Sequence, residues 1–376
     1  MGSEMCIRDS ALPRVGNPTL LSPHSHPLEL VGNTLFVTNT ASDTVDVIDV
    51  KKNEVIQRIP VGIDPVCAKV RPDGNEVWVS NHISDSVSVI DSDPSSPTYL
   101  SVIDTVQDID PVLMSTRFDE PVGIAFADNS KAYVALSSTN RVAVIDVKSR
   151  RVTGHLKIMS QEPRALEVSR GKLYVLPFES NNQTQISGGE KEDLDGELFT
   201  FVARELAGAF DSAGFTVDVV KHMDIPDRDL YVYDVKTDKL VKTVRSLGTL
   251  LFGLDVDSSG NTFVAHTDAR NHSNGRAGTQ GHGLKELQNR PYLNRIAKVS
   301  HQGKVDFIHL NPLPPEQPKR SEGLATPFAV EVTKDLVCLT LAGSDRMITL
   351  DPNSGKILGR VKVGGVPRGI KLELDS

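Results

Sequence analysis

The chain is poor in cysteine. Its 376 residues include only Cys6, Cys67 and Cys338, which lie far apart and form no Cys-x-x-Cys pair. This excludes a dense disulfide framework and a four-cysteine zinc site. Cys-x-x-Cys-His is also absent, so the chain carries no covalently attached c-type haem, and we expect no cofactor within it.

Positive charge in excess and long apolar runs are missing as well. The formal net charge is −8, which provides no electrostatic driving force for binding nucleic acid or an anionic membrane. No stretch reaches the roughly 18 apolar residues of a transmembrane helix, so we expect no membrane insertion. Residues 1–10 resemble translated adapter sequence, and we expect 1–17 to be an artefact followed by a disordered lead. The lack of a signal peptide is therefore uninformative about export.

Signals for nucleophilic catalysis are scarce too. The chain contains no G-x-S-x-G motif, and neither Cys67 nor Cys338 has a histidine or basic partner nearby in sequence. The sequence therefore favours a protein that is not an enzyme, without deciding the question.

A repeat of about forty residues is present instead. The segments Leu35–Asn39 and Asp43–Asp49 return as Val77–Asn81 and Asp85–Asp91, with the same offset of 42 residues (39 to 81, 49 to 91). A third copy covers 132–146. Fixed periods of about 40 to 45 residues built from short strands are typical of propeller blades.

The repeat predicts an all-β fold, a β-propeller that forms a single domain over residues 18–376. Each blade is expected to have four strands, the innermost of which usually follows a proline. Six complete blades are predicted to start near residues 27, 65, 121, 163, 251 and 327. The motif Pro367–Leu372 opens a seventh blade near residue 367 and supplies only its first strand. We therefore expect an incomplete seven-bladed propeller and a sequence that is a fragment of the natural chain.

Long insertions are expected to gather at one rim. In a four-stranded blade, the loops from strand two to strand three share a face with the connections to the next blade. The insertions 178–228 and 268–294 are of the first kind, and the connections 104–120 and 310–326 are of the second. Long loops on a rigid scaffold are where binding residues concentrate, so the mouth of the central channel is the predicted binding surface.

The insertion after the second strand of blade five is the richest in polar residues. It contributes the rim candidates His266, Asp268, Arg270, His272 and Arg276. A self-satisfied polar loop is the favoured interpretation, followed by contact with an anion or partner. Metal ligation by His266, Asp268 and His272 ranks last because their spacing matches no named metal motif, so no metal is expected.

Three further candidates lie at the same rim. Arg164 and Arg368 each follow the proline that opens an innermost strand, and an arginine there suits carboxylate or phosphate recognition. Salt bridging of these arginines to Glu120 or Glu162 is the stronger alternative. His82 follows the second strand of blade two and is expected to be a loop hydrogen-bond donor rather than a catalyst.

The repeats resemble a known family. Leu35–Asn39 and Val77–Asn81, each followed by Ser-Asp-[Thr/Ser]-Val-x-Val-Ile-Asp, are similar to YVTN-family β-propeller repeats. The resemblance is close through residues 27–155 and weaker beyond. It implies a seven-bladed propeller of the lactonase and cytochrome-d1 type, periplasmic or extracellular. The tracts 225–230 and 267–279 resemble bacterial propellers that continue into cytochrome c peroxidase-like haem domains.

Three functions follow as expectations. The first is a non-catalytic recognition or docking module that binds a protein domain or a small ligand at the rim. The second is the N-terminal propeller part of a c-type cytochrome or cytochrome c peroxidase-like redox protein, with haem in a domain outside this chain. The third is a lactonase-like hydrolase, although no matching catalytic residues are found.

Overall fold

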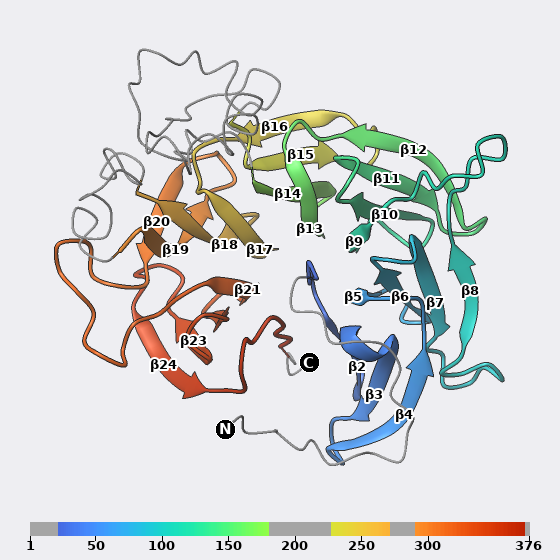
Figure 1. Cartoon of the computed structure of the whole chain (residues 1–376), viewed down its shortest axis with the longest axis horizontal. Helices are drawn as coiled ribbons and strands as arrows, with labels where there is room; N and C mark the ends of the chain where they lie inside the picture. The colour runs from blue at the N-terminus through green and yellow to red at the C-terminus, as the bar shows by residue number, and fades with distance from the viewer. Residues whose placement is uncertain (1–21, 180–226, 271–289, 373–376) are drawn as a thin grey trace, which may run out of the picture.

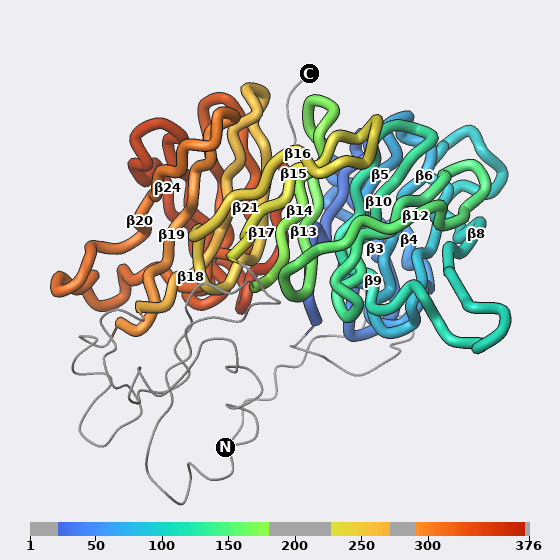
Figure 2. The backbone as a smooth tube through the Cα atoms, turned by 90° about the horizontal axis from the view of Figure 1, so that it is seen from above, coloured from blue at the N-terminus to red at the C-terminus, as the bar shows by residue number. Residues whose placement is uncertain are grey.

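Each repeat folds as one antiparallel sheet whose strands follow one another in chain order. The computed structural model describes residues 22–179, 227–270 and 290–372, which form six such four-stranded sheets around a central axis (Figure 1). We call these sheets blades one to six. Seen from the side, the ring is one layer with its innermost strands running along the axis (Figure 2). The all-β propeller predicted from the repeat is therefore confirmed, with six complete blades.

The strand bounds are as follows. Blade one contains β1 (Leu28–Val31), β2 (Thr34–Asn39), β3 (Thr44–Asp49) and β4 (Glu54–Pro60), and blade two contains β5 (Pro65–Val70), β6 (Glu76–Asn81), β7 (Ser86–Asp91) and β8 (Val102–Val106). Blade three contains β9 (Pro121–Phe126), β10 (Lys131–Leu136), β11 (Arg141–Asp146) and β12 (Arg151–Lys157), and blade four contains β13 (Gln161–Ser169), β14 (Lys172–Glu179), β15 (Leu230–Asp234) and β16 (Leu240–Val244). Blade five contains β17 (Leu250–Val256), β18 (Thr262–Ala269), β19 (Tyr292–Val299) and β20 (Val305–His309), and blade six contains β21 (Pro327–Val332), β22 (Val337–Leu341), β23 (Arg346–Leu350) and β24 (Ile357–Lys362). A short 3-10 turn, η1 (Thr40–Ser42), is the one helical element in the described ranges.

The aspartate that ends many third strands shapes the turn that follows. Asp49 Oδ1 accepts the backbone N–H groups of Lys51 and Lys52, both at 3.0 Å. Asp146 accepts the N–H of Ser149 in the same way, at 2.8 Å. Such carboxylate-capped turns reverse the chain at low cost, which explains why the Val-Ile-Asp pattern recurs.

The core is divided among the spaces between successive blades. Five clusters of buried apolar side chains fill the interfaces from blade one to blade six. Trp78, for example, is fully buried in the interface between blades two and three, with its ring centroid 5.2 Å from that of Phe126. No blade buries both of its faces alone, so the ring depends on its neighbours for stability.

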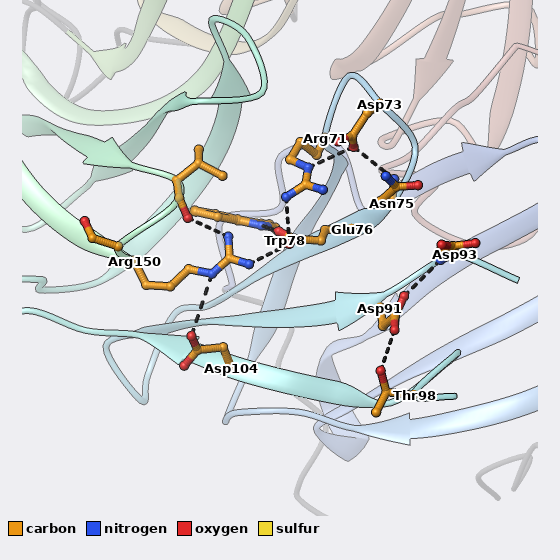
Figure 3. A network of polar contacts seen from close by, with 12 residues as sticks. Arg71, Asp73, Asn75, Glu76, Trp78, Asp91, Asp93, Thr98, Asp104 and Arg150 are labelled. Atoms are coloured by element: carbon orange, nitrogen blue, oxygen red, sulfur yellow. Dashed lines mark hydrogen bonds and ion pairs between the residues drawn. The ribbon is translucent and has the colours of Figure 1, made fainter. Parts of the chain in front are cut away.

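A polar network connects blades two and three beside Trp78 (Figure 3). The Glu76 carboxylate accepts hydrogen bonds from Arg71 at 2.7 Å, from Arg150 at 2.5 Å and from the Trp78 indole at 2.9 Å. Arg150 lies in the turn between β11 and β12, and its guanidinium carbon is 5.2 Å from the centre of the Trp78 ring. Glu76 therefore ties a turn of blade three to the second strand of blade two.

Small residues allow the innermost strands to approach closely. A Cβ atom at Gly123 in β9 would clash with the carbonyl oxygen of Arg164 in β13. We expect Gly123→Ala to lower the free energy of unfolding by about 2 kcal/mol, because the backbone of a packed neighbour cannot yield easily. Gly154→Ala is the matched control, since a Cβ there meets no atom within 4 Å. Urea unfolding of both variants checks this, and equal losses would contradict it.

The predicted first strand of a seventh blade is not observed. Residues 364–372 form no strand, and the described part of the chain offers them no second strand with which to form a ladder. The segment lies instead near the axis, between blade six and blade one (Figure 1). Its Lys371 ammonium is 3.2 Å from the carboxylate of Glu29 in β1 and 3.8 Å from that of Glu331 in β21.

Candidate functional site at the channel mouth

Equivalent positions of the innermost strands meet at one end of the channel. Arg164 and Phe328 each follow the proline near the start of their strand, Arg368 follows Pro367, and Phe252 occupies the matching position of β17. All four side chains are half-buried. The repeat therefore delivers one side chain from each of four segments to the same rim.

These side chains form a continuous surface with Phe178 from the end of β14. The Arg164 guanidinium carbon lies 3.7 Å from the centre of the Phe178 ring. The Phe178 and Phe252 rings are 5.7 Å apart edge-to-face, and the Phe252 and Phe328 rings are 5.3 Å apart. The Arg368 guanidinium carbon is 5.8 Å from the Phe328 ring. We call these five residues the aromatic–arginine arc.

Acidic side chains surround one end of the arc. Arg164 forms an ion pair with Glu162. Burial lowers the pKa of Arg164, while Glu162, Glu179 and Glu120 act in the opposite direction. Burial, reinforced by Glu162, raises the pKa of the Glu179 carboxyl. At its blade-four end, the arc therefore contains an arginine, Arg164, that is paired with the carboxylate of Glu162.

Two histidines lie at the other end of the arc. His24 Nε2 is 2.8 Å from Thr40 Oγ1, whose own proton is donated to the Pro65 carbonyl at 2.8 Å. His24 Nδ1 lies 2.9 Å from the Ser22 carbonyl oxygen, which can only accept a hydrogen bond, and 3.1 Å from Arg368 Nη1. Burial, together with the Arg368 charge, lowers the pKa of His24 to about 4. His82 lies nearby, with its Nε2 4.0 Å from the carboxylate of Glu120. The structure thus brings the predicted candidates His82, Arg164 and Arg368 to one mouth.

The channel narrows directly below the arc. The cavity lined by Phe252, Phe328, Arg368 and the neighbouring backbone measures about 20 Å³. Ligand pockets are typically about 300 to 1,000 Å³, so this cavity has room for little more than one water molecule. Within the described residues, a partner that rests on the arc therefore meets a surface at this point of the mouth.

Below the mouth, the innermost strands direct a set of charged side chains at the axis. Each of these residues pairs with the second or third residue of the second strand in its own blade. The set comprises Glu29, Lys69, Glu167, Asp255 and Glu331, and Ala125 occupies the equivalent position of blade three. Lys69 bridges from blade two to Glu167 of blade four at 2.9 Å. Burial opposes the Lys69 charge, but Glu167 and Glu29 outweigh it and raise the pKa of Lys69.

Asp255 differs from the other acids of this set because no lysine pairs with it among the described residues. Its Oδ2 accepts a hydrogen bond from the backbone N–H of Val332 in β21 at 2.7 Å. Its Oδ1 accepts one from the backbone N–H of the adjacent Val256, also at 2.7 Å. Burial, with the adjacent Glu167 and Glu331 charges, raises the pKa of Asp255 to about 7. Asp255 is therefore partly protonated at neutral pH while it links blades five and six.

A larger groove opens on the same face between blades five and six. It has a volume of about 610 Å³ and extends outward from Phe252, past Leu250 and Tyr292, to Leu324 and Thr326. The connection from blade five to blade six forms one wall. In this connection the Asn311 side chain forms two hydrogen bonds with the backbone of Leu324. Asn311 Nδ2 donates to the Leu324 carbonyl at 2.7 Å, and Asn311 Oδ1 accepts from the Leu324 N–H at 2.9 Å. A side chain of a partner lying on the mouth can enter this groove.

His266 lies apart from the mouth surface. It is fully buried in β18, its ring faces Gly248, where a Cβ atom would clash with Nδ1, and its centroid is 5.9 Å from that of Phe307. Burial, together with the Arg295 charge, lowers the pKa of His266 to about 3. The neutral imidazole is thus part of the packing of blade five and cannot contact a ligand in this structure.

The other candidates of the blade-five insertion are only partly described. Asp268 forms an ion pair of 3.0 Å with Arg295, and Arg270 Nη1 donates to the Arg290 carbonyl at 3.1 Å. His272 and Arg276 lie outside the described residues, as do residues 1–17 and most of both predicted rim insertions. Within the described ranges, no three histidine, cysteine or acidic side chains are placed to share a metal ion.

The sequence reasoning missed the three phenylalanines of the arc and His24. Phe252 and Phe328 were detectable, because they occupy the repeat position that singled out Arg164 and Arg368. Phe178 and His24 come from a strand end and from the segment before β1, and their sequence positions carry no signal of the mouth.

Comparison with known proteins supports the fold alone. No family model and no curated protein matches the chain. Hydrazine synthase from Kuenenia stuttgartiensis is similar in structure, with a TM-score of 0.65 and 18% identity over 94% of this chain and 90% of that one. Virginiamycin B lyase from Staphylococcus aureus has a TM-score of 0.58 and 11% identity, with 94% and 89% covered. The WD40 repeats of RRP9 reach a TM-score of 0.57 at 12% identity, with 94% and 84% covered. At these identities the neighbours show a β-propeller and no shared activity.

Proposed function

We propose that this protein is a non-catalytic β-propeller docking module that binds a partner polypeptide across the channel mouth. The observation that carries the proposal is the aromatic–arginine arc, which joins segments from blades four, five and six and the stretch 367–372 into one half-buried surface. Aromatic and arginine side chains dominate the energetic centres of protein interfaces.

The shape of the mouth suits a polypeptide that lies across it. The cavity of about 20 Å³ beneath the arc is too small for a metabolite. The groove of about 610 Å³ beside Phe252 has room for one or two side chains of such a polypeptide. A rigid ring of six blades holds both features in place, and so little ordering is required on binding.

Peptide selection on the purified protein tests this proposal. Peptides from a displayed random library are selected on the full chain, and their affinities are measured by fluorescence anisotropy. We expect Phe252→Ala and Arg164→Gln to weaken binding by about tenfold or more, as for central interface residues. Arg151→Gln is the matched control, because Arg151 is exposed on β12, the outermost strand of blade three, and belongs neither to the arc nor to the groove. Peptides that bind all variants equally, or a library without binders, would reject the mouth as the docking surface.

The two other functions remain predictions. A redox protein with haem in a further domain, and a periplasmic or extracellular location, rest on the sequence resemblance. In the described ranges no helix has the length and apolarity to span a bilayer. For the lactonase-like hydrolase the sequence offers no matching catalytic residues, and the rim candidate His266 is fully buried. No observation in the structure favours either function over docking.

A further inference from the structure

Another cavity lies at the end of blade three, where β11 begins and β12 ends. It has a volume of about 490 Å³ and reaches the connection that leads to blade four. Among the described residues that line it, Arg141, His155 and Lys157 are basic and none is acidic. Pockets for small molecules typically measure about 300 to 1,000 Å³, so this cavity has the size of a ligand site. We call it the blade-three pocket.

Two positive charges of this pocket lie directly opposite each other. In the antiparallel pair of β11 and β12, Arg141 is the register partner of Lys157, and both side chains are exposed. Like charges at opposite positions of neighbouring strands destabilise a sheet. Within the described ranges, no carboxylate forms an ion pair with Arg141 or Lys157, and no acceptor bonds to either side chain. The fold therefore keeps two adjacent cations that it does not neutralise itself.

Equivalent positions of two other blades show how such an arginine is otherwise accommodated. In blade five, Arg295 pairs with the last residue of the fourth strand and lies 3.0 Å from the Asp268 carboxylate. In blade six, Arg346 pairs with Lys362 and donates a hydrogen bond of 2.5 Å to the Ser321 carbonyl. The blade-three arginine lacks such a partner in the part of the chain that the structure describes, which leaves its donors available.

Neutral groups complete the lining. Asn140 Oδ1 accepts the backbone N–H of Glu162 at 2.9 Å, so its Nδ2 group remains as a donor. Burial, reinforced by the Arg141 charge, lowers the pKa of His155, while Asp108 acts in the opposite direction. The imidazole is therefore mostly neutral at pH 7 and offers one N–H donor. Ile158 and Met159 add a short apolar wall.

We propose that the blade-three pocket binds the phosphate monoester of a small organic molecule. Such a group carries a charge of about −1.5 to −2 at pH 7 and accepts hydrogen bonds through its oxygens, which matches two adjacent cations. Arg141 can donate two parallel N–H bonds to it, and Lys157 contributes a compact charge. The apolar wall contacts the organic part. The proposal is independent of docking at the channel mouth, because the pocket shares no residue with the arc or its groove.

Titration calorimetry with phenyl phosphate, at pH 7 in a buffer free of phosphate, tests the proposal. We expect Arg141→Gln and Lys157→Gln each to weaken binding about tenfold, because each removes a charged donor. Arg346→Gln and Lys362→Gln are the matched controls. They make the same change at the same paired positions of blade six, outside the pocket, and leave the affinity unchanged. Phenyl sulfate, which has a single negative charge, is expected to bind about tenfold more weakly than phenyl phosphate.

Thermal unfolding separates a lost ligand site from a lost fold. We expect the Tm of Arg141→Gln without ligand to be no lower than that of the wild type, since the change removes one of two like charges. Saturating phenyl phosphate raises the Tm of the wild type, because it binds the folded state, and raises that of Arg141→Gln much less.

Four outcomes would overturn the proposal or part of it. The site is rejected if about 10 mM phenyl phosphate gives no binding heat, or if the blade-three and blade-six variants lose equal affinity. Inorganic phosphate that binds as tightly as phenyl phosphate overturns the organic ligand. An alanine-flanked phosphoserine peptide that binds about tenfold more tightly overturns the small molecule as the source of the phosphate.

Discussion

Replacing Glu76 by Ala is expected to lower the free energy of unfolding by about 3 kcal/mol, because it removes one member of a nearly buried charged network. The Glu76 carboxylate accepts from Arg71, Arg150 and the buried indole of Trp78, at 2.7, 2.5 and 2.9 Å. Without it, two guanidinium groups face each other and the indole N–H loses its acceptor. Urea unfolding followed by circular dichroism at pH 7 measures the loss.

The network contains its own control. Asp73 accepts from Arg71 Nε at 2.8 Å but lies on an exposed turn, so Asp73→Ala is expected to cost less than about 1 kcal/mol. Glu76→Gln should fall between the two, since the amide keeps one acceptor for Trp78 and loses the charge. If Glu76→Ala is no more harmful than Asp73→Ala, the Glu76 network does not tie blade three to blade two.

Asp255→Asn is expected to change how stability depends on pH. The pKa of Asp255 is about 7 in the folded protein, against about 3.9 in an unfolded chain. Between these values the folded state holds a proton that the unfolded state has released. The contribution of this carboxyl to stability is therefore complete below pH 4 and is lost as the pH rises to 7. Asparagine does not titrate, so the variant escapes this loss.

The expected outcome is a crossing of the two stability curves. At pH 8 the free energy of unfolding of Asp255→Asn should exceed that of the wild type by about 2 kcal/mol. At pH 4 the free energy of unfolding of Asp255→Asn should be about 1 kcal/mol lower than that of the wild type. The amide offers one acceptor oxygen, whereas the carboxyl accepts hydrogen bonds from the backbone N–H groups of both Val332 and Val256. Urea unfolding at both pH values measures this. Asp306→Asn, on the exposed Asp306, is the control, and parallel shifts for both variants would refute the assignment.

Much of the fold was predictable because the signals are local. Period-two alternation places Val77 and Val79 on one face of a strand, and the aspartate of Val-Ile-Asp caps the next turn through its own neighbours. The insertions 178–228 and 268–294 were predicted to precede the third strands of blades four and five, which the structure places at Leu230–Asp234 and Tyr292–Val299. The first strand of a seventh blade is not observed, because a strand in a sheet needs a paired neighbour as well as a suitable sequence.

The candidate site was predictable only in part. Arg164 and Arg368 were singled out from their place after a proline, and the structure brings them to the mouth with His82. His266 belonged to a segment rich in polar residues, yet it is buried against Gly248 and Phe307, residues 18 and 41 positions away in the chain. Composition along the chain cannot reveal which neighbour encloses a side chain.

The sequence by itself determined the strands, their turns and the radial repetition, because these depend on side-chain alternation and turn chemistry within about forty residues. Only the tertiary structure decided that three phenylalanines and two arginines from different segments form one surface. The physical reason is that every repeat offers the same positions to the axis and to its neighbours. What each position meets depends on the residues that the ring places beside it.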